Sequence, residues 1–158
     1  MDALRFELEY EWEPFMVTGQ HLNFAQLCKR QLFPNECSHW GTAVYKWEGL
    51  LTRGTHVGKV GILIGETENI SQCIQQYATA TSESADFYKH KSFLSQGDVR
   101  LFIFKVHKAT LGIEEPKSIF ESLLVSSPRE RRIVYKELWV TNQVLEKQPH
   151  IVLMNWRS

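Results

Sequence analysis

Two short runs of β-branched and aromatic residues, at 42–47 and 57–64, constrain the fold of this chain more than any other feature of its sequence. Residues 48–56 separate the two runs and include two glycines. Strand-forming runs on either side of a glycine-containing connection are typical of an antiparallel β-hairpin. The sequence therefore predicts a hairpin with a long loop, whose second strand ends at residues 65–68.

A helix is predicted directly after this hairpin. One helix face is indicated by the i, i+3, i+4 and i+7 spacing of four residues: Ile70, Cys73, Ile74 and Tyr77. Asn69 or Thr67 is the expected N-cap, because either side chain can accept a hydrogen bond from a backbone N–H of the first turn. The hairpin is therefore expected to lead into a helix that buries one face.

The rest of the chain favours a mixture of helices and strands without an internal repeat. Residues 1–40 are interpreted as an extended arm followed by a short helix, and residues 87–94 as a second short helix. Residues 99–106 carry apolar side chains at both odd and even positions, which is typical of a central strand covered on both faces. Further elements are expected after Pro116 (a helix), at 129–146 (a helix) and at 151–154 (a terminal strand).

Length and composition indicate one compact domain, since the chain has 158 residues of which 43% are hydrophobic. Eighteen basic and eighteen acidic residues cancel, so any nucleic acid must be bound by local basic patches. The apolar runs are far shorter than the roughly 20 residues that a membrane-spanning helix needs. The N-terminus also lacks the features of a secretory signal. A cytoplasmic protein without a membrane partner is the expectation.

The three cysteines, Cys28, Cys37 and Cys73, form no CxxC pair and favour reduced thiols over a disulfide framework. A structural zinc site is not expected, because the chain offers no second pair of ligands at a recognised spacing.

The hairpin also carries the most specific motif of the chain. Its first strand reads Ala-Val-Tyr-Lys-Trp at 43–47, and its second strand leads into Leu-Ile-Gly-Glu-Thr-Glu-Asn-Ile at 63–70. This pattern resembles the GIY-YIG nuclease family, in which a tyrosine ends a tripeptide on the first strand and a Tyr-Ile-Gly-like tripeptide lies on the second. A Gly-x-x-x-Asn-Leu-like turn then opens the family's first helix.

The resemblance implies an α+β fold with a small three-stranded antiparallel sheet flanked by helices. It would cover residues 41–158 as the nuclease domain and leave residues 1–40 as an N-terminal extension. The implied activity is hydrolysis of a DNA phosphodiester with one divalent metal ion, Mg²⁺ or Mn²⁺. Fixed donors would then oppose the negative charge that grows in the transition state.

The family's catalytic positions are only partly matched in this chain. Tyr45 takes the position of the first-strand tyrosine, nearest the attacking water, although a packed strand tyrosine is the alternative interpretation. Leu63 replaces the second tyrosine, and Gly65 is retained. Cys73 stands where the family has its phosphate-neutralising arginine, and Tyr77 occupies the family's His or Tyr position one turn later. The chain is therefore an impaired, divergent or altered version of such a site.

The metal carboxylate is expected on a later helix. Glu137 is the favoured ligand, because it lies in an apolar helical pattern that precedes Asn155, a residue resembling the family's late asparagine. Glu121 and Glu130 remain alternatives, and each of the three could equally be a solvated surface carboxylate.

Nucleic-acid contacts are expected from basic residues, because DNA binding needs cations that track the phosphates. The candidates are Lys46, Lys89, His90, Lys91, Arg131 and Arg132, together with Asn155. Ordinary solvated surfaces are the alternative interpretation of these clusters. Three hypotheses follow: a DNA endonuclease with a homodimer as one arrangement, a degenerate domain that binds nucleic acid or a protein partner, and an unrelated small α+β interaction protein.

Overall fold

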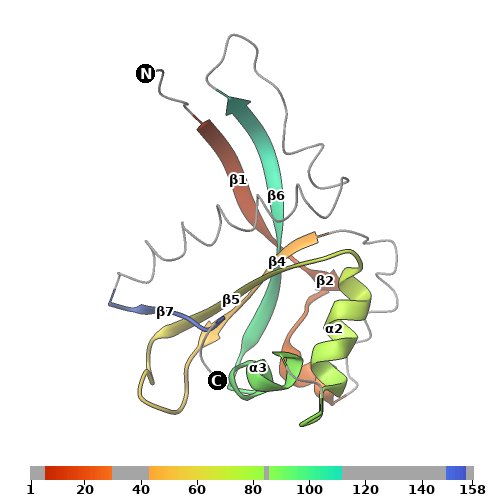
Figure 1. Cartoon of the computed structure of the whole chain (residues 1–158), viewed down its shortest axis with the longest axis vertical. Coiled ribbons are helices and arrows are strands. Elements are labelled where there is room, and N and C mark those ends of the chain that lie inside the picture. Colours follow the sequence, from red (N-terminus) through yellow and green to blue (C-terminus); the bar gives the residue numbers. More distant parts are fainter. Residues whose placement is uncertain (1–5, 30–42, 84–85, 112–148, 156–158) are drawn as a thin grey trace.

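The structure is a computed structural model that describes residues 6–29, 43–83, 86–111 and 149–155. Its centre is a five-stranded mixed sheet with the strand order β1-β6-β4-β5-β7 (Figure 1). The strands are β1 (Phe6–Pro14), β4 (Ala43–Leu50), β5 (Val60–Thr67), β6 (Val99–Leu111) and β7 (Ile151–Leu153). All neighbouring strands are antiparallel except β5 and β7, which are parallel. The fold is therefore of the α+β class, as expected.

The prediction of a small three-stranded antiparallel sheet is wrong. Strands β6, β4 and β5 do form an antiparallel core, but β1 and β7 extend it at its two edges. The backbone groups of β6 (Val99–Leu111) point to two edges, and groups on both edges need partners. Strand β4 pairs with one edge from Val99 to Ile103, and β1 pairs with the other edge from Phe102 to Leu111.

Three helices and a two-stranded sheet complete the described fold. The helices are α1 (Phe24–Cys28), α2 (Ile70–Thr79) and α3 (Asp86–Leu94). Strands β2 (Met16–Val17) and β3 (Gln20–His21) form the small sheet. Their turn places Thr18 and Gly19 at φ 49° and 77°, in the left-handed region that glycine adopts without strain.

The predicted hairpin is confirmed, with β4 and β5 paired from Ala43 with Thr67 to Leu50 with Val60. Its second strand ends at Thr67, within the expected range of 65–68. The helix after it is also confirmed. Asn69 is its N-cap, since its side chain accepts a hydrogen bond of 3.0 Å from the backbone N–H of Gln72.

The N-terminal segment has the predicted order of an extended strand followed by a short helix. It is packed into the same core as the rest of the described chain, because Phe15, Leu22 and Phe24 are almost completely buried. The ring of Phe24 meets that of Trp47 edge to face, with 5.6 Å between the centroids. Residues 15–28 therefore help to hold the sheet and helices together.

The main core lies between the helices and one face of the sheet. The sheet contributes Tyr45, Trp47, Leu63 and Leu101, whereas α2 contributes the apolar face predicted from its spacing. The other face also buries side chains, among them Phe104. Strand β6 is therefore covered on both faces, as its sequence indicated.

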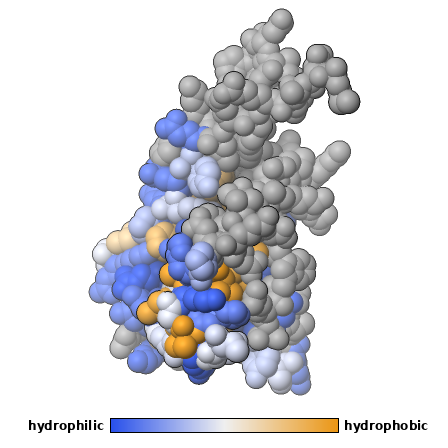
Figure 2. Space-filling model, turned by 90° about the vertical axis from the view of Figure 1, so that its left-hand side faces the viewer, coloured by the Kyte–Doolittle hydropathy of each residue, from blue (hydrophilic) through white to orange (hydrophobic). Residues whose placement is uncertain are grey.

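The surface seen in Figure 2 belongs to the side of β7. The described residues on this side are mostly hydrophilic, with a few apolar groups between them (Figure 2). The expected terminal strand is present as β7, whereas the two helices expected between Pro116 and residue 146 lie outside the described residues.

Candidate functional site

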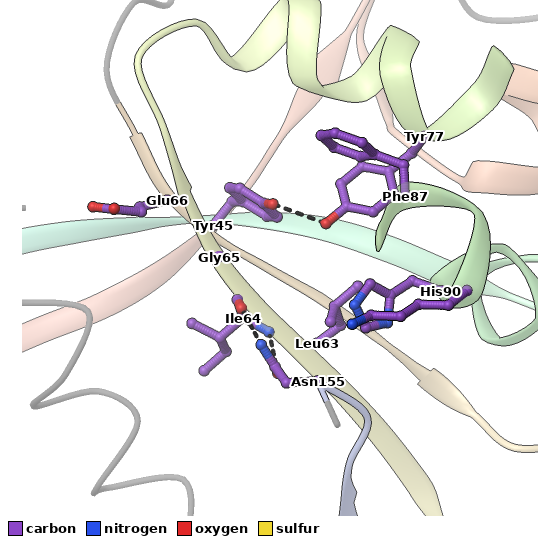
Figure 3. A pocket seen from close by; sticks show the side chains of 10 residues that line it. Tyr45, Leu63, Ile64, Gly65, Glu66, Tyr77, Phe87, His90 and Asn155 are labelled. Atoms are coloured by element: carbon purple, nitrogen blue, oxygen red, sulfur yellow. Dashed lines mark hydrogen bonds between the residues drawn. The ribbon is translucent and has the colours of Figure 1, made fainter. Parts of the chain in front are cut away.

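A pocket of about 360 Å³ lies where β4, β5, α2 and α3 meet the segment after β7 (Figure 3). Its lining includes five residues that the sequence analysis selected: Tyr45, Tyr77, Lys89, His90 and Asn155. They come from four separate parts of the chain, so only the tertiary structure brings them together. This pocket is the candidate site.

Two tyrosines form its inner wall. The hydroxyl oxygens of Tyr45, on β4, and Tyr77, on α2, lie 3.0 Å apart and share a hydrogen bond (Figure 3). Both residues are buried, with 4% and 6% of their surface exposed. The two tyrosines thus lie together, and their rings meet nearly at right angles.

Gly65 makes this arrangement of the tyrosines possible. It pairs directly with Tyr45 across the β4–β5 hairpin. A Cβ atom at position 65 would overlap the hydroxyl oxygen and Cζ of Tyr45 and lie 3.0 Å from its Cε1. The absent side chain at 65 therefore leaves room for the Tyr45 ring.

Cys73 contacts Tyr45 but is not among the residues that line the pocket. It lies on the buried face of α2 with 4% of its surface exposed. Burial raises the pKa of its thiol, and hydrogen bonds with Tyr45 and Thr67 only partly oppose this effect. Cys73 is therefore a neutral thiol in the place where the resemblance implies a cation.

Burial also keeps the phenol of Tyr45 neutral. Loss of solvation raises its pKa well above the ordinary value, and the neighbouring Tyr77 and Cys73 raise the pKa further. A neutral phenol can donate or accept a hydrogen bond, but it cannot act as a phenolate base near neutral pH. Tyr45 can therefore orient a bound group at the pocket.

Asn155 has a clear structural task at the edge of the pocket. Its Nδ2 donates to the backbone oxygen of Ile64 at 2.5 Å, and its Oδ1 accepts from the N–H of Ile64 at 3.0 Å. Through these two bonds the Asn155 side chain pairs with the backbone of β5 just beyond the last backbone pair of β5 and β7 (Figure 3). The amide thus fastens the segment after β7 to the strand that carries Gly65.

The basic residues at 89–91 on α3 have two different surroundings. Lys89 is exposed and lines the pocket, and His90 lines it with 8% of its surface exposed. Lys91 points elsewhere, since its Nζ donates to the backbone oxygens of Ala78 and Ala80 at 3.2 and 3.0 Å. Lys91 therefore ties α3 to the end of α2.

Lys46 lies outside the pocket lining, because side chains alternate along β4 and its neighbour Tyr45 points into the core. The Nζ of Lys46 lies 4.8 Å from the ring centroid of Trp12 and 5.1 Å from that of Phe102. It also lies 3.7 Å from the carboxylate of Glu48, and burial lowers the pKa of Lys46. The structure therefore separates Lys46 from the pocket residues.

Several predicted residues lie outside the described part of the chain. These are Glu137 with its alternatives Glu121 and Glu130, and the basic residues Arg131 and Arg132. Within the described residues, no three His, Cys, Asp or Glu side chains are close enough to hold a metal ion together. A cation site cannot be built from the described pocket residues alone, and Glu137 stays a prediction.

Two further residues of the pocket lining were not selected from the sequence. Glu66 follows Gly65 on β5 and points away from the tyrosines, whereas Phe87, on α3, packs edge to face on Tyr77 with 4.9 Å between the centroids (Figure 3). Glu66 could have been noticed as the one carboxylate next to the glycine of the motif. Nothing in the local sequence marks Phe87, since its position depends on how α3 packs on α2.

Comparisons with protein-family models, with curated proteins and with solved structures give no match for this chain. None of the helices among the described residues combines the length and the hydrophobicity needed to cross a membrane.

Proposed function

We propose that this pocket binds a phosphodiester of DNA and that the chain is a divalent-metal-dependent endonuclease domain similar to the GIY-YIG nucleases. The observation that carries the proposal is the pair of buried tyrosine hydroxyls at the pocket wall, 3.0 Å apart and drawn from β4 and α2. The motif that resembles the family provides both tyrosines and the glycine between them. The proposed compartment is the cytoplasm, and a homodimer is part of the same proposal.

The residues of the pocket suit the orientation of a reacting water more than its deprotonation. Tyr45 is held neutral by burial, which raises its pKa, so it would position the water by hydrogen bonding. Lys89 is the exposed cation of the described lining and would face a phosphate oxygen. A divalent ion at Glu137 would polarise the scissile phosphate.

The neutral Cys73 predicts slow hydrolysis. Donors that meet the charge of the transition state typically contribute a factor of about 10²–10³ in rate. At position 73 the structure has a buried thiol with a raised pKa. This thiol also supports the second candidate function, a domain that keeps the fold and binds nucleic acid or a protein partner without cleaving DNA.

The test is cleavage of plasmid and oligonucleotide DNA with Mg²⁺ or Mn²⁺ by the natural chain and by Cys73→Arg. Cys73→Arg is expected to cleave about 10²–10³ times faster, because it places a cation beside the tyrosine pair. Cys73→Met is the matched control, since it adds bulk at the same buried position without charge. The double variant Cys73→Arg/Glu137→Ala is expected to lose the gained activity.

The two candidate functions give different results in this assay. Cleavage that requires both Arg at 73 and Glu at 137 supports the endonuclease. DNA binding without cleavage by any folded variant supports the binding domain. Equal cleavage by Cys73→Arg and Cys73→Met would contradict the role assigned to charge at this position.

A further inference from the structure

A second hollow of about 350 Å³ lies next to the pocket along α3. We call it the α3 groove, and its lining consists of Arg53, Tyr88, Lys89, Lys91, Ser92 and Ser95. Lys89 lines both hollows, so the groove and the pocket adjoin at this residue. A chain that enters the pocket could therefore continue along α3.

The groove contains an exposed aromatic ring. Tyr88 has 48% of its surface exposed, whereas Tyr45 and Tyr77 are buried in the core. An exposed tyrosine offers a flat apolar face to which an unstacked nucleobase can bind, and each stacked base contributes substantially to binding of single strands. Tyr88 is therefore suited to contact a base.

Three cationic side chains line the groove together with this ring, and two of them are held in place by backbone oxygens. Arg53 donates from Nη2 to the oxygen of Ser92 at 3.1 Å, and Lys91 donates to the oxygens at the end of α2. The loop that carries Arg53 is itself fastened, because Gln96 accepts from the backbone N–H groups of Thr52 and Arg53. Among the described residues that line the groove, none is acidic. The groove is therefore positively charged and suited to phosphates.

We infer that the α3 groove binds single-stranded DNA, with a base stacked on Tyr88 and the flanking phosphates close to Arg53 and Lys89. This inference rests on the proposed function, because the single strand would lead to the phosphodiester held in the pocket. Stacking and cations in one groove are the combination by which proteins bind single strands without reading their sequence. In a duplex, the base faces are already stacked on one another, so Tyr88 could not reach them.

The experiment measures binding of the full chain to a fluorescein-labelled oligothymidine by fluorescence anisotropy, without divalent metal so that no cleavage occurs. A duplex of similar length and labelled polyglutamate are measured beside it. Tyr88→Ala is expected to weaken single-strand binding about tenfold, whereas Tyr88→Phe keeps the ring and binds like the natural chain. Circular dichroism checks that each variant is folded.

The charged residues are tested in the same assay by changing the salt concentration. Lys89→Gln is expected to reduce the slope of log affinity against log salt by about 0.7, because one phosphate contact is lost. Lys105→Gln is the matched control, since Lys105 is an exposed lysine on β6 that pairs with Glu13. It is expected to leave the slope unchanged.

Four results would overturn the inference. Unchanged single-strand binding by a folded Tyr88→Ala would refute the stacking site but leave the proposed function intact. Binding of duplex or polyglutamate as tight as that of the single strand would show a general polyanion surface. If the chain binds neither single-stranded nor duplex DNA, both the groove and the proposed function are refuted. If metal-dependent cleavage occurs at the same rate in Tyr88→Ala as in the natural chain, the groove alone is refuted.

Discussion

Gly65→Ala should break the arrangement of the two tyrosines while adding only one methyl group. The new Cβ would overlap the hydroxyl oxygen and Cζ of Tyr45 and lie 3.0 Å from Cε1. Carbon atoms pack at about 3.5–4.0 Å, so the Tyr45 ring has to move by about 1 Å. The hydrogen bond between the hydroxyl oxygens of Tyr45 and Tyr77, which are 3.0 Å apart, would be lengthened or lost.

The expected loss of stability follows from two costs and one opposing gain. Overpacking in a core costs about 1–3 kcal/mol, and the weakened buried hydrogen bond costs about 1 kcal/mol more. Replacing glycine by alanine restricts the unfolded chain and returns about 0.4–1 kcal/mol. We therefore expect a net loss of about 2 kcal/mol, which for a chain of this size lowers Tm by about 4–8 °C.

A double-mutant cycle by urea denaturation tests whether this loss arises from the contact with Tyr45. Gly65→Ala is compared in the natural chain and in a Tyr45→Leu background, where the shorter side chain leaves room for the methyl group. The cost of Gly65→Ala should fall by about 1 kcal/mol or more in that background. An equal cost in both backgrounds, or no cost in the natural chain, would refute the argument.

Three further variants test the site. Tyr77→Phe should cost about 1–2 kcal/mol of unfolding free energy, and adding Tyr45→Phe should cost less than the sum of the two single changes, because both remove the same hydrogen bond between the hydroxyls. Because burial raises the pKa of Tyr45 in the fold, its contribution to stability is complete below pH of about 10 and is lost as the pH rises through the folded pKa. Tyr45→Phe should therefore show a flatter decline of Tm in alkaline buffer than the natural chain, whereas Tyr88→Phe, at an exposed position, should not. Asn155→Ala removes both the Nδ2 donor to the Ile64 oxygen and the Oδ1 acceptor of the Ile64 N–H, and it should cost about 1–3 kcal/mol. Hydrogen exchange at the Ile64 amide should become faster, and unchanged exchange would contradict the fastening role.

These tests separate stability from function at the pocket. Asn155 acts on the backbone of β5, whereas Lys89 and Tyr88 are exposed side chains whose replacement should leave the fold intact. A loss of DNA binding in the exposed variants would therefore report on contact with the ligand. The same loss in an Asn155 variant would report on the position of the strand.

The local elements of the described chain could be predicted because each depends on neighbouring residues. The hairpin over residues 43–67 follows from two β-forming runs and their loop, and helix α2 follows from its apolar spacing and its cap at Asn69. Burial of Cys73 on the apolar face of that helix was also indicated by its position between Ile70 and Ile74. In these cases, short-range periodicity was sufficient.

The predicted size of the sheet was wrong because edge strands are chosen by long-range pairing. Phe6 pairs with Leu111 and Val60 with Ile151, and no local pattern relates residues so far apart in sequence. The resemblance directed attention to residues 41–158, so the role of Phe15 and Phe24 in the core was not foreseen. Strand pairing depends on which edges remain free after the centre of the sheet has formed.

The sequence by itself determined the hairpin, the helix after it, and the residue types at the tyrosine, glycine and cysteine positions of the motif. Only the tertiary structure decided that Tyr45 occupies the space left by Gly65, that Lys46 lies apart from the pocket, and that Lys89 lines both the pocket and the α3 groove. The physical reason is that residue type and spacing set local conformation, whereas a site depends on which faces of distant elements pack together.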